Sequence, residues 1–171
     1  MTEFALVAPV LLVLTFGILD FGRALYYYAA AGNAAREGAH VAVRATSPNL
    51  PTDADVKAAV AVHFPGVTMV APSPNCPNDP TPGGMPPAGS AWVFVNAPAP
   101  AVPGEVGTPA NAPGGEQPVT NPPCQPMVPA IHRQLLEVTV VYNYVPVTPL
   151  ISSVFANHIV FTLRVLARTE Y

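Results

Sequence analysis

A long apolar stretch near the N-terminus constrains the fold of this chain more than any other feature. Every residue from Phe4 to Leu19 is apolar except Thr15. As a helix, the 16 residues of this stretch span about 24 Å, slightly short of the roughly 20 residues that a bilayer core requires. Continuing the helix to the tyrosines at 26–28 supplies the missing length and places their rings at the membrane interface. The sequence therefore predicts one long helix that can enter lipid.

Small residues follow the apolar stretch at helical spacing. They form two rows with a four-residue period: Ala30, Ala34, Gly38 and Ala42, and Ala31, Ala35 and Ala39. Because such rows let helix backbones approach closely, we expect the helix to run to about residue 46 and to pack against copies of itself. Asp20 and Arg23 lie three residues apart on it, so we expect them partly to neutralise each other. Pro9 removes one backbone donor, which predicts a kink or local melting.

Three interpretations of this N-terminal segment compete. A cleaved secretory signal fits the small residues Ala29–Ala31, but Met1–Glu3 carries no basic n-region and Asp20 interrupts the approach to such a site. A generic membrane anchor explains the hydrophobicity but not the acid Glu3 or the rows of small residues. We favour a membrane anchor that also packs into an assembly.

Three short segments of the first 40 residues carry a specific resemblance. They are TEFALVAP at 2–9, GILDFGRAL at 17–25 and NAAREGA at 33–39. In order and spacing they resemble the N-terminal signature of TadE-like pilin-related proteins, from the tight-adherence branch of type IV pili. The resemblance implies a membrane-inserted precursor that a prepilin peptidase cleaves, and an apolar helix that then moves into a helical filament. The printed sequence does not include a basic leader ending in glycine, so processing is implied by the resemblance alone.

The acid at the start of the apolar stretch has two interpretations. In the resemblance, Glu3 matches the acidic residue just inside the mature N-terminus of pilins. A carboxylate among hydrocarbon is costly unless paired, and a neighbour's N-terminal ammonium would pair with it and set the axial register. The alternative is a solvated acid favoured by the helix dipole. The candidate assembly residues are Glu3, Phe4, Pro9, Asp20, Arg23, Ala34 and Gly38.

The second part of the chain, residues 47–171, is expected to be an exported α+β domain. Alternation of apolar and polar residues predicts strands at 134–145 and 158–169, and shorter strands are expected at 67–70 and 91–96. A short amphipathic helix is expected at 53–64, capped by Thr52 or Asp53. We expect a small antiparallel sheet whose apolar face is covered by the second half of the long helix, a pilin-like architecture.

A proline-rich insertion is expected at about 71–130, where 17 of the 23 prolines lie. We interpret it as a surface-decorating insertion; the alternative is a linker without function. Cys76 and Cys124 are the two cysteines, and outside the cytoplasm they are expected to form a disulfide.

The sequence offers little sign of catalytic chemistry. The four histidines, His40, His63, His132 and His158, are scattered, and neither a zinc-ligand pattern nor a nucleophile elbow is present. With a formal charge of −3 and no basic stripe, nucleic acid is not an expected partner. We expect no catalytic residue, no cofactor, no metal and no enzymatic activity.

The preferred functional hypothesis is a structural pilin-like subunit. It would polymerise through its N-terminal helix into an extracellular, Tad-type filament on the cell surface, after residing in the inner (cytoplasmic) membrane. Its partners would be copies of itself, and by resemblance the prepilin peptidase and the pilus assembly machinery. The alternative is a minor pseudopilin or a single-pass membrane protein that primes assembly or binds a partner.

Overall fold

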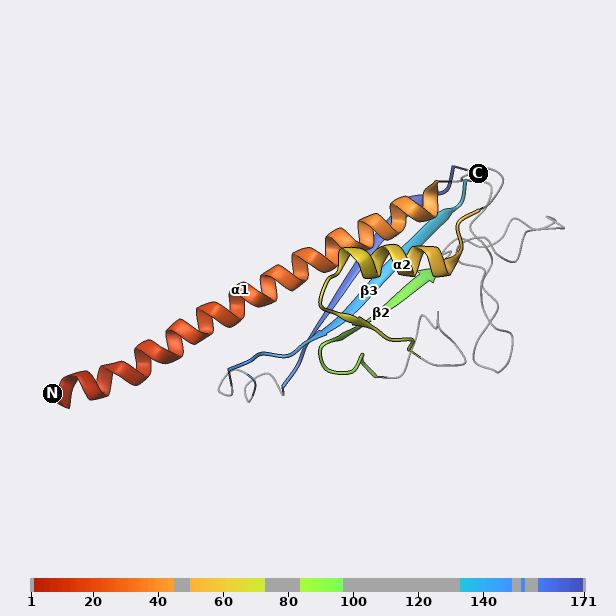
Figure 1. Cartoon of the computed structure of the whole chain (residues 1–171). Helices are drawn as coiled ribbons and strands as arrows, with labels where there is room; N and C mark the ends of the chain where they lie inside the picture. The colour runs from red at the N-terminus through yellow and green to blue at the C-terminus, as the bar shows by residue number, and fades with distance from the viewer. Residues whose placement is uncertain are drawn as a thin grey trace.

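The computed structural model describes residues 2–44, 50–72, 84–96, 133–148, 152 and 157–170, with only the backbone for residues 2, 3 and 5. Two helices and four strands follow one another along the chain (Figure 1). Their bounds are α1 Thr2–Val43, α2 Asp53–His63, β1 Thr68–Met69, β2 Ser90–Asn96, β3 Leu135–Tyr144 and β4 Ile159–Arg168. The predicted α+β class, with a long apolar N-terminal helix on a small sheet, is confirmed.

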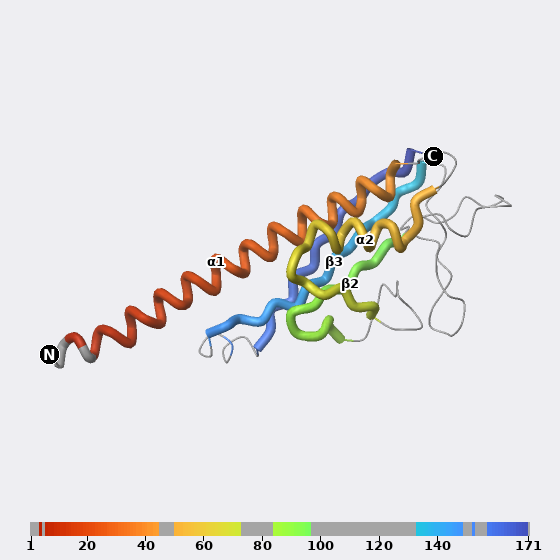
Figure 2. Tube along the Cα trace, in the orientation of Figure 1, coloured from red at the N-terminus to blue at the C-terminus, as the bar shows by residue number. Residues whose placement is uncertain are grey.

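Helix α1 has two halves with different surroundings. Its 42 residues give a length of about 63 Å, and the N-terminal half projects beyond the rest of the molecule (Figure 1). The C-terminal half lies along the sheet, and the chain after β4 returns to the end of this half (Figure 2). There the Glu170 backbone N–H donates to the carbonyl of Val43 at 3.4 Å. The helix is continuous through Pro9, so the predicted local melting is wrong, because one missing donor is tolerated between intact turns, whereas the predicted kink stays a prediction.

The sheet has the strand order β1-β2-β3-β4. Strands β2, β3 and β4 are antiparallel, with Val140 of β3 opposite Val93 of β2 and Leu163 of β4. Strand β1 is parallel to β2, so the sheet is mixed rather than purely antiparallel as predicted. Parallel neighbours need a crossover of about a dozen residues or more, and residues 70–89 supply it.

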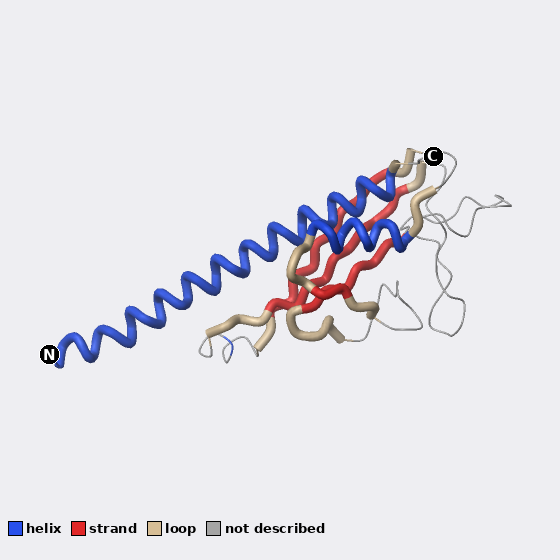
Figure 3. The backbone as a smooth tube through the Cα atoms, viewed as in Figure 1, coloured by secondary structure: helices blue, strands red, loops and turns tan. Residues whose placement is uncertain are grey.

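Both helices cover one face of the sheet (Figure 3). Alternate residues of β3 point into this layer and are almost fully buried: Leu136, Val138, Val140, Tyr142 and Tyr144. From α1 they meet the ring of Tyr27 and a set of small side chains, Ala31, Ala34, Ala35, Ala39 and Ala42, which are all buried. The prediction that the second half of the long helix covers the apolar face is confirmed.

The start of α2 is fixed by a capping box. The Thr52 hydroxyl accepts from the Asp55 backbone N–H at 3.2 Å, and the Asp55 carboxylate accepts from the Thr52 backbone N–H at 2.8 Å. These hydrogen bonds satisfy two donors that a helix end otherwise leaves without partners. Thr52 is therefore the cap, and α2 begins one residue later, where it can lay Val56 and Val60 on α1.

Gly38 lies in the contact between α1 and α2. A Cβ atom placed on it would lie 2.6 Å from Cγ2 of Val60, 3.4 Å from Cγ1 of Val56 and 3.5 Å from Cγ1 of Val138. The small residues on α1 thus allow the chain's own α2 and sheet to pack closely against the helix. Spacing alone had pointed to copies of the helix, because it reports a close approach and not the identity of the approaching element.

Much of the proline-rich insertion lies outside the described residues, including Cys76 and Cys124. Within residues 71–130, the structure describes only 71–72 and 84–96, and the latter range contains β2. The predicted disulfide and the surface role of the insertion therefore stay predictions.

We expect Gly38→Ala to destabilise the protein by about 1–3 kcal/mol, because the new methyl group overpacks the fully buried Val60. Gly22→Ala is the matched control on the same helix, since a Cβ at Gly22 meets nothing within 4 Å. That change should be neutral or stabilising by up to about 1 kcal/mol. Denaturant unfolding of the full chain in detergent measures both. Equal stabilisation by the two substitutions would contradict the close contact.

Candidate functional site: the projecting helix and its junction with the sheet

The projecting segment, Phe4–Leu19, exposes large apolar side chains in all directions. Their exposed fractions run from 45% at Val13 to 78% at Phe4. Five consecutive residues, 10–14, are all exposed, and successive side chains on an α-helix are about 100° apart. No side of this stretch therefore packs on the sheet domain. An apolar surface of this extent marks contact with lipid or with protein.

The length and composition of α1 also suit a membrane. Within the described residues, one helix is long and apolar enough to cross a bilayer, and its candidate span is Leu6–Val43. The core helix of a soluble protein can pass the same test, but the most apolar part of α1 is almost wholly exposed. An N-terminal helix suited to membrane anchoring is therefore present.

Burial on α1 begins at Asp20, a charged residue that is only 5% exposed. Its carboxylate accepts hydrogen bonds from the backbone N–H of Val147 at 3.2 Å and of Thr148 at 2.9 Å. The Thr148 hydroxyl donates to the same carboxylate, and the Tyr144 hydroxyl donates to the Asp20 carbonyl at 3.1 Å. We call these four contacts the Asp20 junction. They fasten α1 to the end of β3 at the point where the helix leaves the sheet.

The predicted attraction between Asp20 and Arg23 is present, but other groups hold the Asp20 carboxylate. Arg23 is exposed and contributes only a weaker electrostatic attraction, whereas the hydrogen bonds from Val147 and Thr148 hold the carboxylate. A buried carboxylate needs donors at hydrogen-bond distance, and the segment after β3 supplies them without desolvating a guanidinium.

Aromatic rings fill the space behind the junction. The Tyr27 ring packs against those of Tyr142 and Tyr144, with centroid distances of 5.2 and 5.9 Å. Burial raises the pKa of Tyr144 above its ordinary value and the pKa of Tyr142 to about 12. Both hydroxyls therefore stay protonated at neutral pH, and Tyr144 remains a donor to Asp20.

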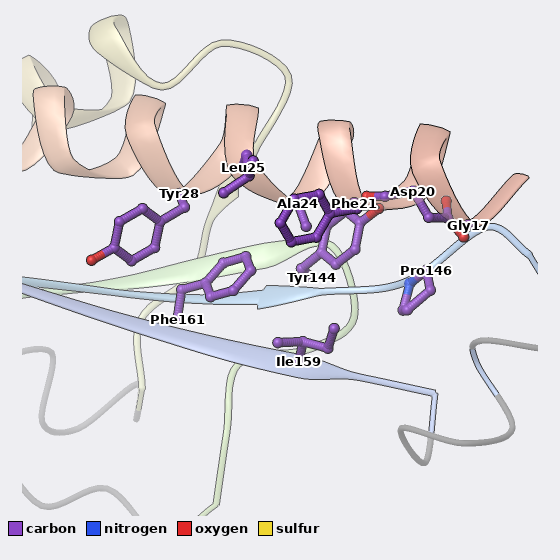
Figure 4. Close-up of a pocket in the computed structure, with 10 residues that line it drawn as sticks. All are labelled: Gly17, Asp20, Phe21, Ala24, Leu25, Tyr28, Tyr144, Pro146, Ile159 and Phe161. Atoms are coloured by element: carbon purple, nitrogen blue, oxygen red, sulfur yellow. Dashed lines mark hydrogen bonds between the residues drawn. The ribbon is translucent and has the colours of Figure 1, made fainter. Parts of the chain in front are cut away.

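An apolar groove of about 520 Å³ opens beside the Asp20 junction (Figure 4). One wall is α1, with Phe21, Leu25 and Tyr28, and the facing wall is the sheet, with Tyr144 and Phe161. Asp20 lines the groove too, but its carboxylate is already bound by Val147 and Thr148. The groove is thus a concave apolar surface without an unsatisfied charge.

The candidate residues predicted from the sequence fall into separate regions. Phe4 and Pro9 lie on the projecting segment, and Arg23 lies exposed just past the junction. Ala34 and Gly38 are buried against the chain's own domain. These residues remain predicted assembly residues, and of them only Arg23 interacts with Asp20, through the weaker electrostatic attraction.

Glu3 belongs to α1, but its side chain lies outside what the structure describes. Its pairing with a neighbour's ammonium therefore stays a prediction. Sequence reasoning missed Tyr144, Val147 and Thr148 as partners of Asp20. Two of the three donors at the carboxylate are backbone N–H groups, which any residue except proline provides, so the sequence held no signal for them.

The described residues hold no group of three His, Cys, Asp or Glu side chains placed to bind a metal ion. What the site offers is an exposed apolar rod, a hydrogen-bonded junction and an apolar groove. These features suit insertion of the helix into lipid and its packing against other apolar surfaces.

We expect Asp20→Asn to loosen the junction, since an amide replaces one acceptor oxygen with a donor that faces other donors. The free energy of local opening at Val147 and Thr148 should fall by about 2–4 kcal/mol. Amide hydrogen exchange of the full chain in detergent measures it. Arg23→Gln is the control and should change the same free energy by less than about 0.5 kcal/mol. Unchanged protection at Thr148 in Asp20→Asn would show that the junction does not hold the helix.

A comparison with protein-family models matches residues 1–40 to the family described as TadE-like protein. No curated protein and no solved structure matches the chain. The matched region contains the projecting segment, Asp20 and most of the row of small residues, and such proteins are typically structural. The resemblance predicted from the sequence is confirmed: the N-terminal segment of this chain is TadE-like, consistent with a Tad pilus-associated, pilin-like protein.

Proposed function

We propose that this chain is a structural pilin-like subunit that polymerises through α1 into an extracellular Tad-type filament on the cell surface. The observation that carries the proposal is the projecting segment Phe4–Leu19, which is apolar and exposed on all sides while the rest of α1 is bound to the sheet. The folded domain of such a subunit is fixed to one end of α1, and the apolar projecting segment at the other end is free. This segment can therefore leave one apolar environment and enter another.

Lipid and copies of the helix are the two coverings that suit this rod. Burying a Val, Leu or Phe side chain is worth about 1.5–3 kcal/mol, so the exposed residues of the projecting segment would strongly disfavour water. Before assembly, the inner membrane covers them. Outside the cell, neighbouring copies of α1 are the available apolar partners. The free energy gained by burying these side chains against one another then drives polymerisation.

The remaining proposals follow from the TadE-like match. The pilus assembly machinery is the implied partner, and a prepilin peptidase is proposed to process the chain. Residues 47–171 are proposed to be the exported part, with the proline-rich insertion on the filament surface and Cys76 joined to Cys124. Phe4, Pro9, Asp20 and Arg23 are proposed to contribute to subunit contacts or to the geometry that presents them.

Material sheared from the cell surface should contain filaments composed mainly of this chain. Electron microscopy of the sheared fraction, with mass spectrometry of the same sample, checks this expectation. If the intact protein remains in the membrane fraction and is missing from sheared filaments, the chain is instead a membrane-retained minor component that primes assembly or binds a partner.

We expect Glu3→Gln to reduce surface filaments at least tenfold while the protein still accumulates in the membrane, because the neutral side chain cannot pair with a neighbour's ammonium. Glu37→Gln is the matched control, as it removes one carboxylate elsewhere on α1. Quantitative immunoblotting of sheared and membrane fractions measures both variants. Normal filament yield from Glu3→Gln would exclude a register role for Glu3.

A further inference from the structure

The apolar groove beside the Asp20 junction lacks a covering from the described part of the chain. On its α1 wall, Phe21 is 65% and Leu25 is 52% exposed, and on the sheet wall Phe161 is only half-buried. Figure 4 shows these side chains facing one another across the groove. Apolar side chains arranged in two facing walls form a seat for a third apolar element.

The chemistry of the walls restricts the occupant to an uncharged apolar segment. Among the described residues that line the groove, Asp20 is the one ionised group, and it already accepts hydrogen bonds from Val147 and Thr148, so an incoming cation would find no unsatisfied carboxylate there. A charged or strongly polar occupant would lose its hydration without compensation.

We propose that the groove receives the projecting helix of a second copy, through its residues 4–16. This inference rests on the proposed function and names the contact that joins two subunits. Residues 4–16 carry no charged side chain, and the described side chains among them are exposed except Ala8, which is half-buried. The groove begins where the projecting segment ends, so a helix docked in it covers apolar wall residues that the described part of the first copy leaves exposed.

The proposal fixes an axial offset between the two copies. The α1 wall of the groove runs from Gly17 to Tyr28, and the docked segment is 4–16. Because all copies enter the membrane in one orientation, the two helices are parallel. The midpoints of the two segments are about 12.5 residues apart, which places the copies about 19 Å from each other along the helix axis. The proposed pairing of Glu3 with an ammonium needs a much smaller offset and thus involves a different neighbour.

Photocrosslinking in assembled filaments tests the contact. A benzophenone amino acid replaces Leu25, on the groove wall, or Tyr26, its neighbour in sequence, which is 60% exposed and does not line the groove. Trypsin cleavage after Arg23 and Arg36 separates peptides 1–23 and 24–36. We expect the Leu25 probe to give crosslinked dimers that join peptide 24–36 to peptide 1–23 within residues 4–16, at least fivefold more than the Tyr26 probe.

A second pair of variants tests the groove without a probe. Ala24→Phe fills the groove, whereas Ala29→Phe adds the same ring at an exposed position outside it. We expect Ala24→Phe to lower filament yield at least tenfold and Ala29→Phe to leave it within twofold, with both proteins accumulating in the membrane.

The outcomes separate the inference from the proposed function. Filaments in which the Leu25 probe reacts only with lipid, with its own chain or with another copy outside residues 4–16 overturn the docking contact and leave the filament subunit standing. Equal filament yields from Ala24→Phe and Ala29→Phe overturn it as well. If the wild-type chain forms no filament, the proposed function fails and the inference fails with it.

Discussion

The structure depends on one buried carboxylate, that of Asp20. Val147 and Thr148 surround it with donors, and this contact sets the point where α1 stops being part of a folded core and becomes a free rod. An ionised group buried without such donors would be strongly unfavourable. The hydrogen bonds therefore do two things: they make the burial of Asp20 tolerable, and they hold the sheet against the helix at its exit.

Side-chain size divides α1 between its two environments. Past Asp20, alanines and Gly38 bring α2 and the sheet within van der Waals contact of the helix backbone. Before Asp20, leucines, valines and phenylalanines keep any partner farther from the axis and present far more apolar surface. The sheet and α2 bury most of these small residues, namely Ala31, Ala34, Ala35, Ala39 and Ala42. The large apolar residues before Asp20 need a solvent or partner that can surround the helix on all sides. Lipid and a bundle of identical helices both do so.

The periodic spacing of apolar and small residues in the sequence predicted the fold. It could not predict contacts between residues that are far apart in the chain. Alternation placed β3 and β4 within one residue of their observed bounds and identified the buried face of β3. The Asp20 junction joins residues 127 and 128 positions apart through backbone donors, whereas the sequence indicated only the weaker attraction to the helical neighbour Arg23. The close approach at Gly38 was likewise predicted, but its partner, Val60, is fixed only by tertiary structure.

The groove and the junction share residues, and this links the folding of one subunit to its association with the next. Asp20 and Tyr144 line the groove and also carry the hydrogen bonds that hold the sheet on α1. If the end of β3 leaves the helix, the sheet wall of the groove leaves with it. A copy whose sheet domain is not seated on α1 therefore offers no complete groove to another copy, although its projecting segment is intact. In the proposed filament, the sheet of a copy must therefore pack on its own α1 before a second copy can dock. The projecting segment alone is not sufficient for this contact.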